Sequence, residues 1–212
     1  RGIALPDTNN ILDLATGSIS AGTVTLSGYQ AILDGSGGSV TVSGATSISG
    51  NRAIMDARGT GNSFGAVTIT GSQAILEHGG GTSGPINISG NSALWQAYGP
   101  VTVSGSPAIT VGGGALVQNF GASAAITVNG DVIVGGPGGQ LDPFATGGWT
   151  INGNLQLTGS GRLRMDQTTD TVRVNGNVSF AGGDHTGALT DGALFVTGNF
   201  SQSGVATSFV GT

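Results

Sequence analysis

Short stretches that alternate apolar and polar residues recur along the chain, and each of them ends in a glycine. Such alternation places the apolar residues on one face of a β-strand and the polar residues on the other. A lone strand of about five residues cannot bury its apolar face, so successive copies must pack against one another. The repeated stretches read VTLSG, VTVSG, VTITG, INISG, VTVSG, ITVNG, WTING, VRVNG and LFVTG.

The glycines that end these strands give the period of the repeat. The marks chosen are Gly28, Gly50, Gly71, Gly90, Gly105, Gly130, Gly153, Gly176 and Gly198, at intervals of 22, 21, 19, 15, 25, 23, 23 and 22 residues. In the second copy either Gly44 or Gly50 fits, and choosing Gly50 makes the six residues between them an insertion. We therefore predict an all-β, right-handed parallel β-helix (β-solenoid) of about nine coils of roughly 22 residues. Residues 1–212 then form a single solenoid domain, either complete or a segment of a longer protein.

Parallel stacking of the coils lines up the apolar residues as continuous ladders, with neighbouring strands about 4.8 Å apart. The strand-final glycines are expected to supply the positive φ angles of the corners. One predicted ladder contains Val24, Val67, Ile86, Val101, Ile126, Trp149, Val172 and Leu194. Its companion contains Leu26, Ile69, Ile88, Val103, Val128, Ile151, Val174 and Val196.

An antiparallel sandwich is the competing all-β interpretation, because Asn-Gly is a hairpin signal and occurs at 129–130, 152–153 and 175–176. These dipeptides keep one phase of the roughly 22-residue period, which a sandwich has no reason to preserve. The pattern therefore favours the β-helix.

Composition supports an all-β chain and narrows the functions. There are 42 glycines, a single glutamate and no lysine, which disfavours long helices. Charged residues make up 8% of the chain and the net charge is −5, so nucleic-acid binding is not expected. No cysteine is present, and no apolar run approaches the roughly 20 residues of a membrane-spanning helix.

The strand-plus-glycine coils, the phrases VNGNVSFAGG and VTGNFSQSG and the lysine-free, cysteine-free composition resemble the parallel β-helical parts of bacterial secreted surface proteins. These include filamentous-haemagglutinin-type adhesins and autotransporter passengers. The resemblance implies an extracellular or cell-surface location and an adhesive or structural role. It brings no catalytic residues to this chain.

A column of acidic and amide side chains is the first candidate site. It lies six residues past the glycine in four copies and contains Asp34, Asp56, Glu77 and Gln96. Stacked about 5 Å apart, such oxygens are ligands for Ca²⁺, and Arg52 and Arg58 lie on the middle coil, as in calcium-dependent polysaccharide lyases. The alternative is a solvated corner, and Val111 is expected to end the column. We expect no cofactor, with Ca²⁺ at Asp34, Asp56 and Glu77 as the alternative.

Two outward columns are candidates for contact with other molecules. Strict alternation turns an aliphatic stripe of Ile32, Ile54, Ile75 and Leu94 outward, as an assembly surface, unless the corner bends it inward. Alanines three residues past the glycines, namely Ala31, Ala53, Ala74, Ala93 and Ala108, are expected to close that corner. An exposed threonine column of Thr25, Thr41, Thr68, Thr102, Thr127 and Thr150 resembles the arrays of ice-binding proteins, although exposed strands commonly use threonine.

Histidine chemistry is not expected. Asp184 and His185 form a pair in GGDHTGALTDG, residues 182–192, which we predict to be a protruding loop with His185 at its surface. The pair lacks the further ligand or nucleophile that zinc or triad chemistry needs.

The sequence thus predicts a non-enzymatic extracellular solenoid, either the rod of a surface adhesin or the subunit of a self-assembling fibre. Its expected partners are further copies of the chain, joined end to end or laterally, and a host surface or polysaccharide. A carbohydrate-active or glycan-binding β-helix protein is the first alternative, and an ice-binding protein is the second.

Overall fold

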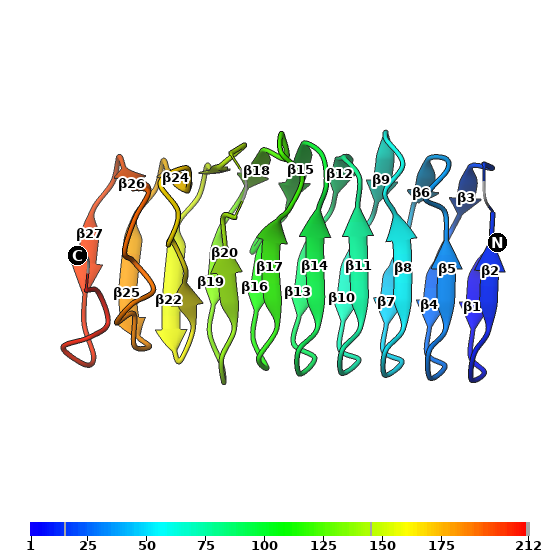
Figure 1. Ribbon diagram of the computed structural model, residues 1–212, viewed down its shortest axis with the longest axis horizontal. Coiled ribbons are helices and arrows are strands. Elements are labelled where there is room, and N and C mark those ends of the chain that lie inside the picture. Colours follow the sequence, from blue (N-terminus) through cyan, green and yellow to red (C-terminus); the bar gives the residue numbers. More distant parts are fainter. Residues whose placement is uncertain (15, 145, 211–212) are drawn as a thin grey trace.

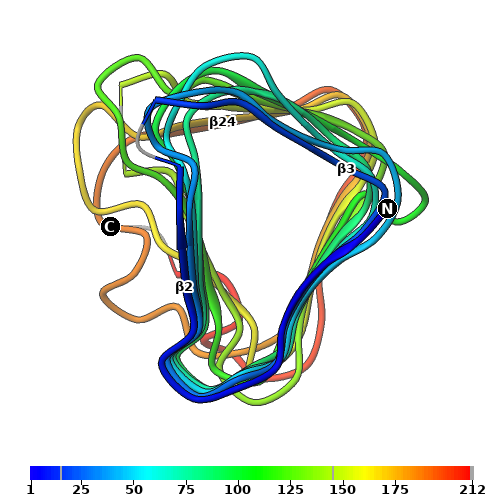
Figure 2. The same cartoon turned by 90° about the vertical axis from the view of Figure 1, so that its right-hand side faces the viewer.

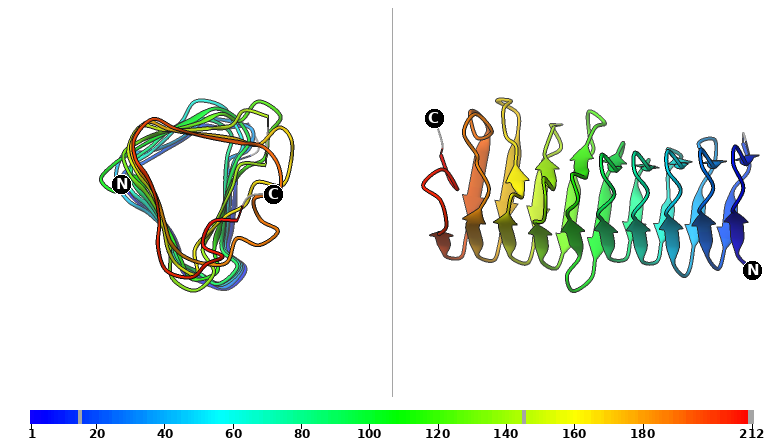
Figure 3. Two further views of the ribbon diagram at one scale, coloured as in Figure 1. Left: turned by 90° about the vertical axis from the view of Figure 1, so that its left-hand side faces the viewer. Right: turned by 90° about the horizontal axis from the view of Figure 1, so that it is seen from below.

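The protein is a rod built from stacked coils of β-strand (Figure 1). The computed structural model describes residues 1–14, 16–144 and 146–210, and every regular element in these ranges is a strand. Seen along its axis, the rod has a triangular cross-section (Figure 2), and the view from the other end has the same outline (Figure 3). The predicted parallel β-solenoid of about nine coils is confirmed.

The coils contribute strands to three parallel sheets of ten, eight and nine strands, which we call sheets A, B and C in the order the chain visits them. Sheet A contains β1 (Ile3–Leu5), β4 (Val24–Leu26), β7 (Thr46–Ile48), β10 (Val67–Ile69), β13 (Ile86–Ile88), β16 (Ile109–Val111), β19 (Val132–Val134), β22 (Leu155–Gly159), β25 (Val178–Gly182) and β27 (Phe200–Gln202). Sheet B contains β2 (Ile11–Asp13), β5 (Ile32–Asp34), β8 (Ile54–Ala57), β11 (Ile75–His78), β14 (Leu94–Ala97), β17 (Leu116–Asn119), β20 (Gln140–Asp142) and β23 (Arg162–Leu163). Sheet C contains β3 (Ile19–Ala21), β6 (Val40–Val42), β9 (Asn62–Phe64), β12 (Gly81–Ser83), β15 (Val101–Ser104), β18 (Ile126–Asn129), β21 (Trp149–Ile151), β24 (Thr171–Val174) and β26 (Ala193–Val196).

The coil is right-handed. In Figure 2 the N-terminal end faces the viewer. From the N-terminus the chain runs clockwise through β2 and then β3 as it recedes from the viewer. This is the hand expected for parallel strands joined by crossovers within one sheet.

The core fills the triangle with the inward residues of all three sheets. Trp95 and Trp149 are fully buried, and the indole N–H of Trp149 donates to Asn119 Oδ1 at 3.0 Å. A second buried amide, Asn62, accepts the Val40 N–H at 2.8 Å and donates to two backbone carbonyls. The buried amides of Asn62 and Asn119 therefore donate to backbone carbonyls at the end of β8 and in the segments that follow β8 and β17, where regular strand pairing is interrupted.

The predicted ladders join two different sheets, and this part of the prediction is wrong. Val24, Val67 and Ile86 of the first ladder, with Leu26, Ile69 and Ile88 of the second, lie in sheet A. The remaining members, from Val101 and Val103 to Leu194 and Val196, lie in sheet C. The 15-residue interval between Gly90 and Gly105 is where the chosen marks change from one corner of the triangle to another.

The same shift of corner explains two smaller errors. The residues between Gly44 and Gly50 are not an insertion, because β6 is the sheet C strand of one coil and β7 is the sheet A strand of the next, in the regular order. Ala108 does not continue the alanine column, since Leu94 pairs with Leu116 and the next member is therefore Ala115.

The loop before the last coils folds back onto the solenoid. Residues 183–192 join β25 to β26, and Leu189 forms an isolated parallel bridge with Met165. The Met165 N–H donates to the Ala188 carbonyl at 2.6 Å, so this loop takes the place of a sheet B strand. Among the described residues, no helix has the length and apolar character needed to cross a membrane.

Candidate functional site

Sheet B carries two outward columns with different chemistry. The first is aliphatic for six coils and then becomes polar: Ile11, Ile32, Ile54, Ile75, Leu94, Leu116, Gln140 and Arg162. The second is acidic or amide throughout: Asp13, Asp34, Asp56, Glu77, Gln96, Gln118 and Asp142. The residue between these two positions on each strand points inward. This inward column includes Leu33, Met55 and Trp95, all fully buried.

The predicted aliphatic stripe points outward. Ile32, Ile54, Ile75 and Leu94 are half-buried, because each packs between the same column's residues on the coils before and after. Ile11 has 65% of its surface exposed. Whether this stripe mediates assembly stays a prediction.

The predicted acidic column is also in register, but it is longer than expected. Val111 does not end the column, since Val111 is a buried residue of sheet A. Gln118 and Asp142 occupy the next two positions instead. The column therefore extends over seven coils.

Hydrogen-bond donors of the same or the preceding coil contact the carboxylates of Asp34, Asp56 and Glu77. The Ser36 hydroxyl and N–H donate to Asp34 Oδ1 at 2.7 and 3.0 Å, and these bonds lower the pKa of Asp34. The Arg58 guanidinium contacts Asp56 at 2.5 Å and Glu77 at 3.3 Å. Arg58 therefore takes the position between two carboxylates that the calcium interpretation gives to the ion. Within the described residues, no group of three or more His, Asp or Glu side chains is arranged to hold a metal ion.

A row of aromatic side chains runs beside the acidic column. The Tyr98 and Phe120 ring centroids are 5.5 Å apart, and those of Phe120 and Phe144 are 5.7 Å apart with an angle of 9° between the rings. Phe120 and Phe144 are exposed, whereas the Tyr98 hydroxyl donates to Glu77 Oε1 at 3.0 Å. Burial and this contact raise the pKa of Tyr98. The three rings form a continuous apolar surface over successive coils.

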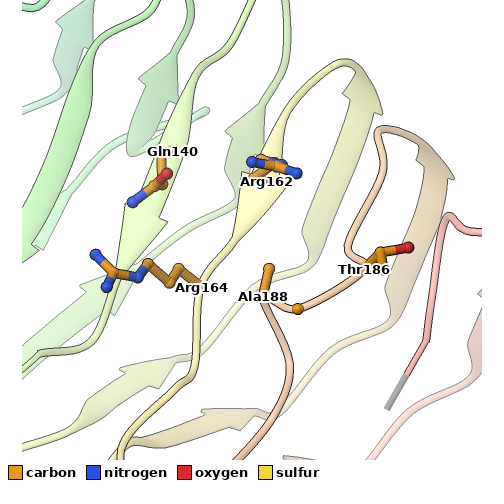
Figure 4. A pocket seen from close by; sticks show the side chains of 6 residues that line it. Gln140, Arg162, Arg164, Thr186 and Ala188 are labelled. Carbon is orange, nitrogen blue, oxygen red and sulfur yellow. The ribbon is translucent and has the colours of Figure 1, made fainter. Parts of the chain in front are cut away.

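Sheet B also carries a small cavity toward its C-terminal end (Figure 4). The cavity has a volume of about 220 Å³ and is lined by Gln140, Arg162, Arg164, Thr186, Gly187 and Ala188. Arg164 contacts Asp142 at 3.3 Å and Asp166 at 2.6 Å. Burial raises the pKa of Asp142 to about 6, although Arg164 lowers it.

The predicted threonine column is split between two sheets, so this prediction is wrong as a single surface. Thr25 and Thr68 lie in sheet A, while Thr41, Thr102, Thr127 and Thr150 lie in sheet C. Sheet C has its own hydroxyl column, formed by Ser20, Thr41, Ser63, Thr82, Thr102, Thr127 and Thr150. Ice binding by the protein stays a prediction.

Both histidines are buried, which corrects the prediction of a surface histidine at 185. His185 Nε2 accepts the Leu163 N–H at 3.1 Å, and burial lowers the pKa of His185. Asp184 directs its carboxylate to the Thr186 N–H at 2.9 Å. His78 lies edge-on to Phe64 and Trp95, with ring centroids 5.0 and 5.9 Å away.

Sequence reasoning missed the aromatic row and the arginine-lined cavity. Their signal is present in the chain as the fragments QAYG, QNFG and LDPF, each with an aromatic residue two positions after an amide or acid of the outward column. The glycines chosen as marks after Gly90 follow sheet C instead of sheet A, so QNFG and LDPF did not align with QAYG in the repeat.

Comparison of the chain with models of known protein families, with curated proteins and with solved structures gives no match in any of the three. Functional argument therefore depends on the geometry of the rod and of sheet B.

Proposed function

We propose that this chain is a non-enzymatic, extracellular structural and adhesive β-solenoid. The observation that carries the proposal is the unbroken register of three parallel sheets along the rod. From β1 to β24 each coil is hydrogen-bonded to its neighbours on three sides, so bending this part of the rod requires distortion of three ladders at once. Such a body acts as a stiff spacer that holds a binding surface away from its point of attachment.

The polar side chains of sheet B support a binding role rather than a catalytic one. Asp34 is held by Ser36, while Asp56 and Glu77 share Arg58. A general acid or base must reach a substrate proton, and carboxylates held in this way are directed at neighbouring groups of the coil. The extracellular location rests on the resemblance to secreted β-helical surface proteins.

Electron microscopy and an adhesion assay test this proposal together. Purified chain should appear as rods of uniform width, and it should be retained on polysaccharide-coated or cell-derived surfaces at moderate salt. The proposal would be overturned by flexible or globular particles in micrographs, or by rods that adhere to none of the surfaces.

A glycan-binding role on sheet B is the second candidate, and the aromatic row favours it. Exposed aromatic faces carry partial negative charge and attract the C–H groups of a sugar ring. The amides of Gln96 and Gln118 lie in the adjacent column, where both side chains are largely buried, so polar contacts to a sugar would come from groups at the edge of the row, such as the Tyr98 hydroxyl. Together they provide the stacking and hydrogen-bonding groups that a saccharide chain needs.

Affinity electrophoresis in gels containing neutral or acidic polysaccharides tests the second candidate. Phe120→Ala should reduce retardation by at least threefold, since it removes the middle ring of the row. Phe195→Ala is the matched control, because Phe195 is an equally exposed phenylalanine on sheet C, where it contacts Arg173. Equal retardation of the two variants would argue against a glycan site on sheet B.

A further inference from the structure

The cavity at the end of sheet B has a polar lining without carboxylates. Its polar side chains are Gln140, Arg162, Arg164 and Thr186, of which two are cationic and two are neutral (Figure 4). The chain as a whole has a net charge of −5 and an acidic column on the same sheet. Arg164 is paired with Asp142 and Asp166, so among the described residues Arg162 is the cation of this lining that has no ion pair.

Arg162 directs unused hydrogen-bonding capacity toward this cavity. Its Nε donates to the Asp184 carbonyl at 2.7 Å, which fixes the half-buried side chain in place. Within the described part of the chain, no carboxylate forms an ion pair with Arg162. Arg58 and Arg164 differ, because each contacts two carboxylates at 4.0 Å or less.

The position of Arg162 connects the cavity to the candidate glycan face. Arg162 pairs with Gln140, which pairs with Leu116, so both occupy the outward column that is aliphatic in earlier coils. Phe144 lies four residues after Gln140 and ends the aromatic row. Four extended residues span about 13 Å, so a saccharide of two or more sugar residues is long enough to stack on Phe144 and present a charged group to Arg162.

We propose that this cavity binds the carboxylate or sulfate group of an acidic saccharide. The inference rests on the proposed glycan-binding face and specifies the class of its ligand. A guanidinium with free N–H groups binds planar carboxylates and sulfates through paired hydrogen bonds. The volume of about 220 Å³ is below the roughly 300–1,000 Å³ of sites for drug-sized ligands. It suits one charged sugar residue, with the rest of the saccharide lying along sheet B.

Titration calorimetry with four probes tests the inference. The probes are glucuronic acid, glucose 6-sulfate, glucose and inorganic sulfate, added to the whole chain at low salt. We expect glucuronic acid or glucose 6-sulfate to bind at least tenfold more tightly than glucose, and the tighter of the two identifies the charged group. Binding should weaken as salt is raised, because screening reduces attraction between exposed charges. Equal affinity for charged and neutral sugars, or inorganic sulfate binding as tightly as glucose 6-sulfate, would overturn the inference.

Three variants assign the site. Arg162→Gln should abolish the preference for the charged sugar, while Arg162→Lys should retain part of it, since lysine keeps the charge without the planar fork. Arg173→Gln is the matched control, because Arg173 is an exposed arginine on sheet C. Thermal unfolding of each variant establishes that it is folded. An unchanged preference in a folded Arg162→Gln would contradict the assignment.

The outcomes separate this inference from the proposals beneath it. If the unaltered protein shows no preference for a charged sugar but is still retarded by neutral polysaccharide, only the anion site is excluded. Absence of any saccharide binding removes the glycan-binding candidate as well, while the rod seen in micrographs tests the structural proposal independently.

Discussion

At the corner between sheets A and B, the glycine allows close approach of the neighbouring coil, and the residue two positions after it adopts the positive φ angle of the turn. Gly28, Gly50 and Gly71 do not adopt the positive φ angles expected of them, which fall instead on Gln30, Arg52 and Gln73. A Cβ on each glycine would lie within 3 Å of backbone atoms of the coil before it. These positions are glycine because the coils approach so closely there.

We therefore expect Gly71→Ala to lower the free energy of unfolding by about 3 kcal/mol, since neither backbone can move away without breaking sheet register. Gly61→Ala is the control, because Gly61 has a φ of +72° and open space around its Cβ position. It should cost only about 1 kcal/mol, the strain of a left-handed conformation. Urea unfolding measures both, and a loss at Gly71 no larger than that at Gly61 would contradict close coil approach as the reason for glycine at position 71.

His78 is a titratable group enclosed by the core. It is fully buried, and its two ring nitrogens have no hydrogen-bond partner in the described residues. Burial lowers its pKa from 6.5 to about 4, because the charged imidazolium is disfavoured away from water. The folded protein therefore holds this side chain neutral at pH values where the unfolded chain binds a proton.

This difference makes stability depend on pH in a defined window. The free energy of unfolding should fall as the pH is lowered from 6.5 toward about 4, by a total of about 3 kcal/mol from this residue. Asp142 acts in the opposite direction between about 6 and 3.8, since its folded pKa is raised. The measurement is therefore the difference between wild type and His78→Leu in urea unfolding across this range. Parallel pH profiles would contradict the assignment.

At the scale of elements, two amide ladders connect the coils at the corner between sheets C and A. In one, the Asn152 side chain donates to Asn129 Oδ1, and the Asn175 side chain donates to Asn152 Oδ1, each at 2.8 Å. In the other, Asn154 Oδ1 accepts the backbone N–H of Asn177 at 2.8 Å. The second ladder satisfies backbone groups that the corner removes from sheet pairing.

Asn154→Ala should therefore cost more stability than Asn152→Ala. The first removes the acceptor of the exposed Asn177 N–H and the donor to Asp131 Oδ1, and we expect a loss of about 1 kcal/mol. The second removes bonds between exposed side chains, and we expect a loss of about 0.5 kcal/mol or less. Chemical denaturation of the two single variants checks the difference. An equal cost would show that the side-chain ladder stabilises the corner as much as the backbone ladder does.

At the scale of the whole molecule, the sequence was sufficient for the fold and for part of the candidate site. Alternation and a fixed period establish parallel stacking, because only neighbouring coils can cover faces such as Val24 and Leu26. They do not reveal which sheet a given strand joins, since VTVSG at Val40 and at Val101 belongs to sheet C while VTLSG at Val24 belongs to sheet A. Strands in two sheets carry the same local pattern, and only the spacing between them distinguishes the sheets.

The same limit applies to the columns of sheet B. Asp34, Asp56 and Glu77 were aligned correctly because the marks from Gly28 to Gly90 stay at one corner. The partners of these acids could not be predicted from the sequence. The contact of Arg58 with Glu77 on the following coil depends on the conformation of the arginine side chain, which the repeat does not specify. The cavity at Arg162 depends on a loop that leaves the repeat, so periodicity carries no information about it.

The aliphatic stripe leads to a prediction about the rod as a whole. A column of six outward aliphatic residues on a flat sheet offers a continuous apolar line, and a second rod lying alongside could cover it. The engaged carboxylates beside it reduce the repulsion between two such faces, because Arg58 offsets part of their charge. If this stripe mediates lateral assembly, association should depend on its central residues.

Replacing both Ile54 and Ile75 by Asn should shift the protein toward monomer in sedimentation velocity at high concentration, because these two residues are at the centre of the aliphatic stripe. The matched control replaces Thr102 and Thr127 by Asn. These two threonines are half-buried outward residues on sheet C. Circular dichroism establishes that both double variants keep their strands. A wild-type protein that remains monomeric, or a stripe variant that associates as the control does, would exclude the stripe as the assembly surface and leave sheet B free along its length for a saccharide.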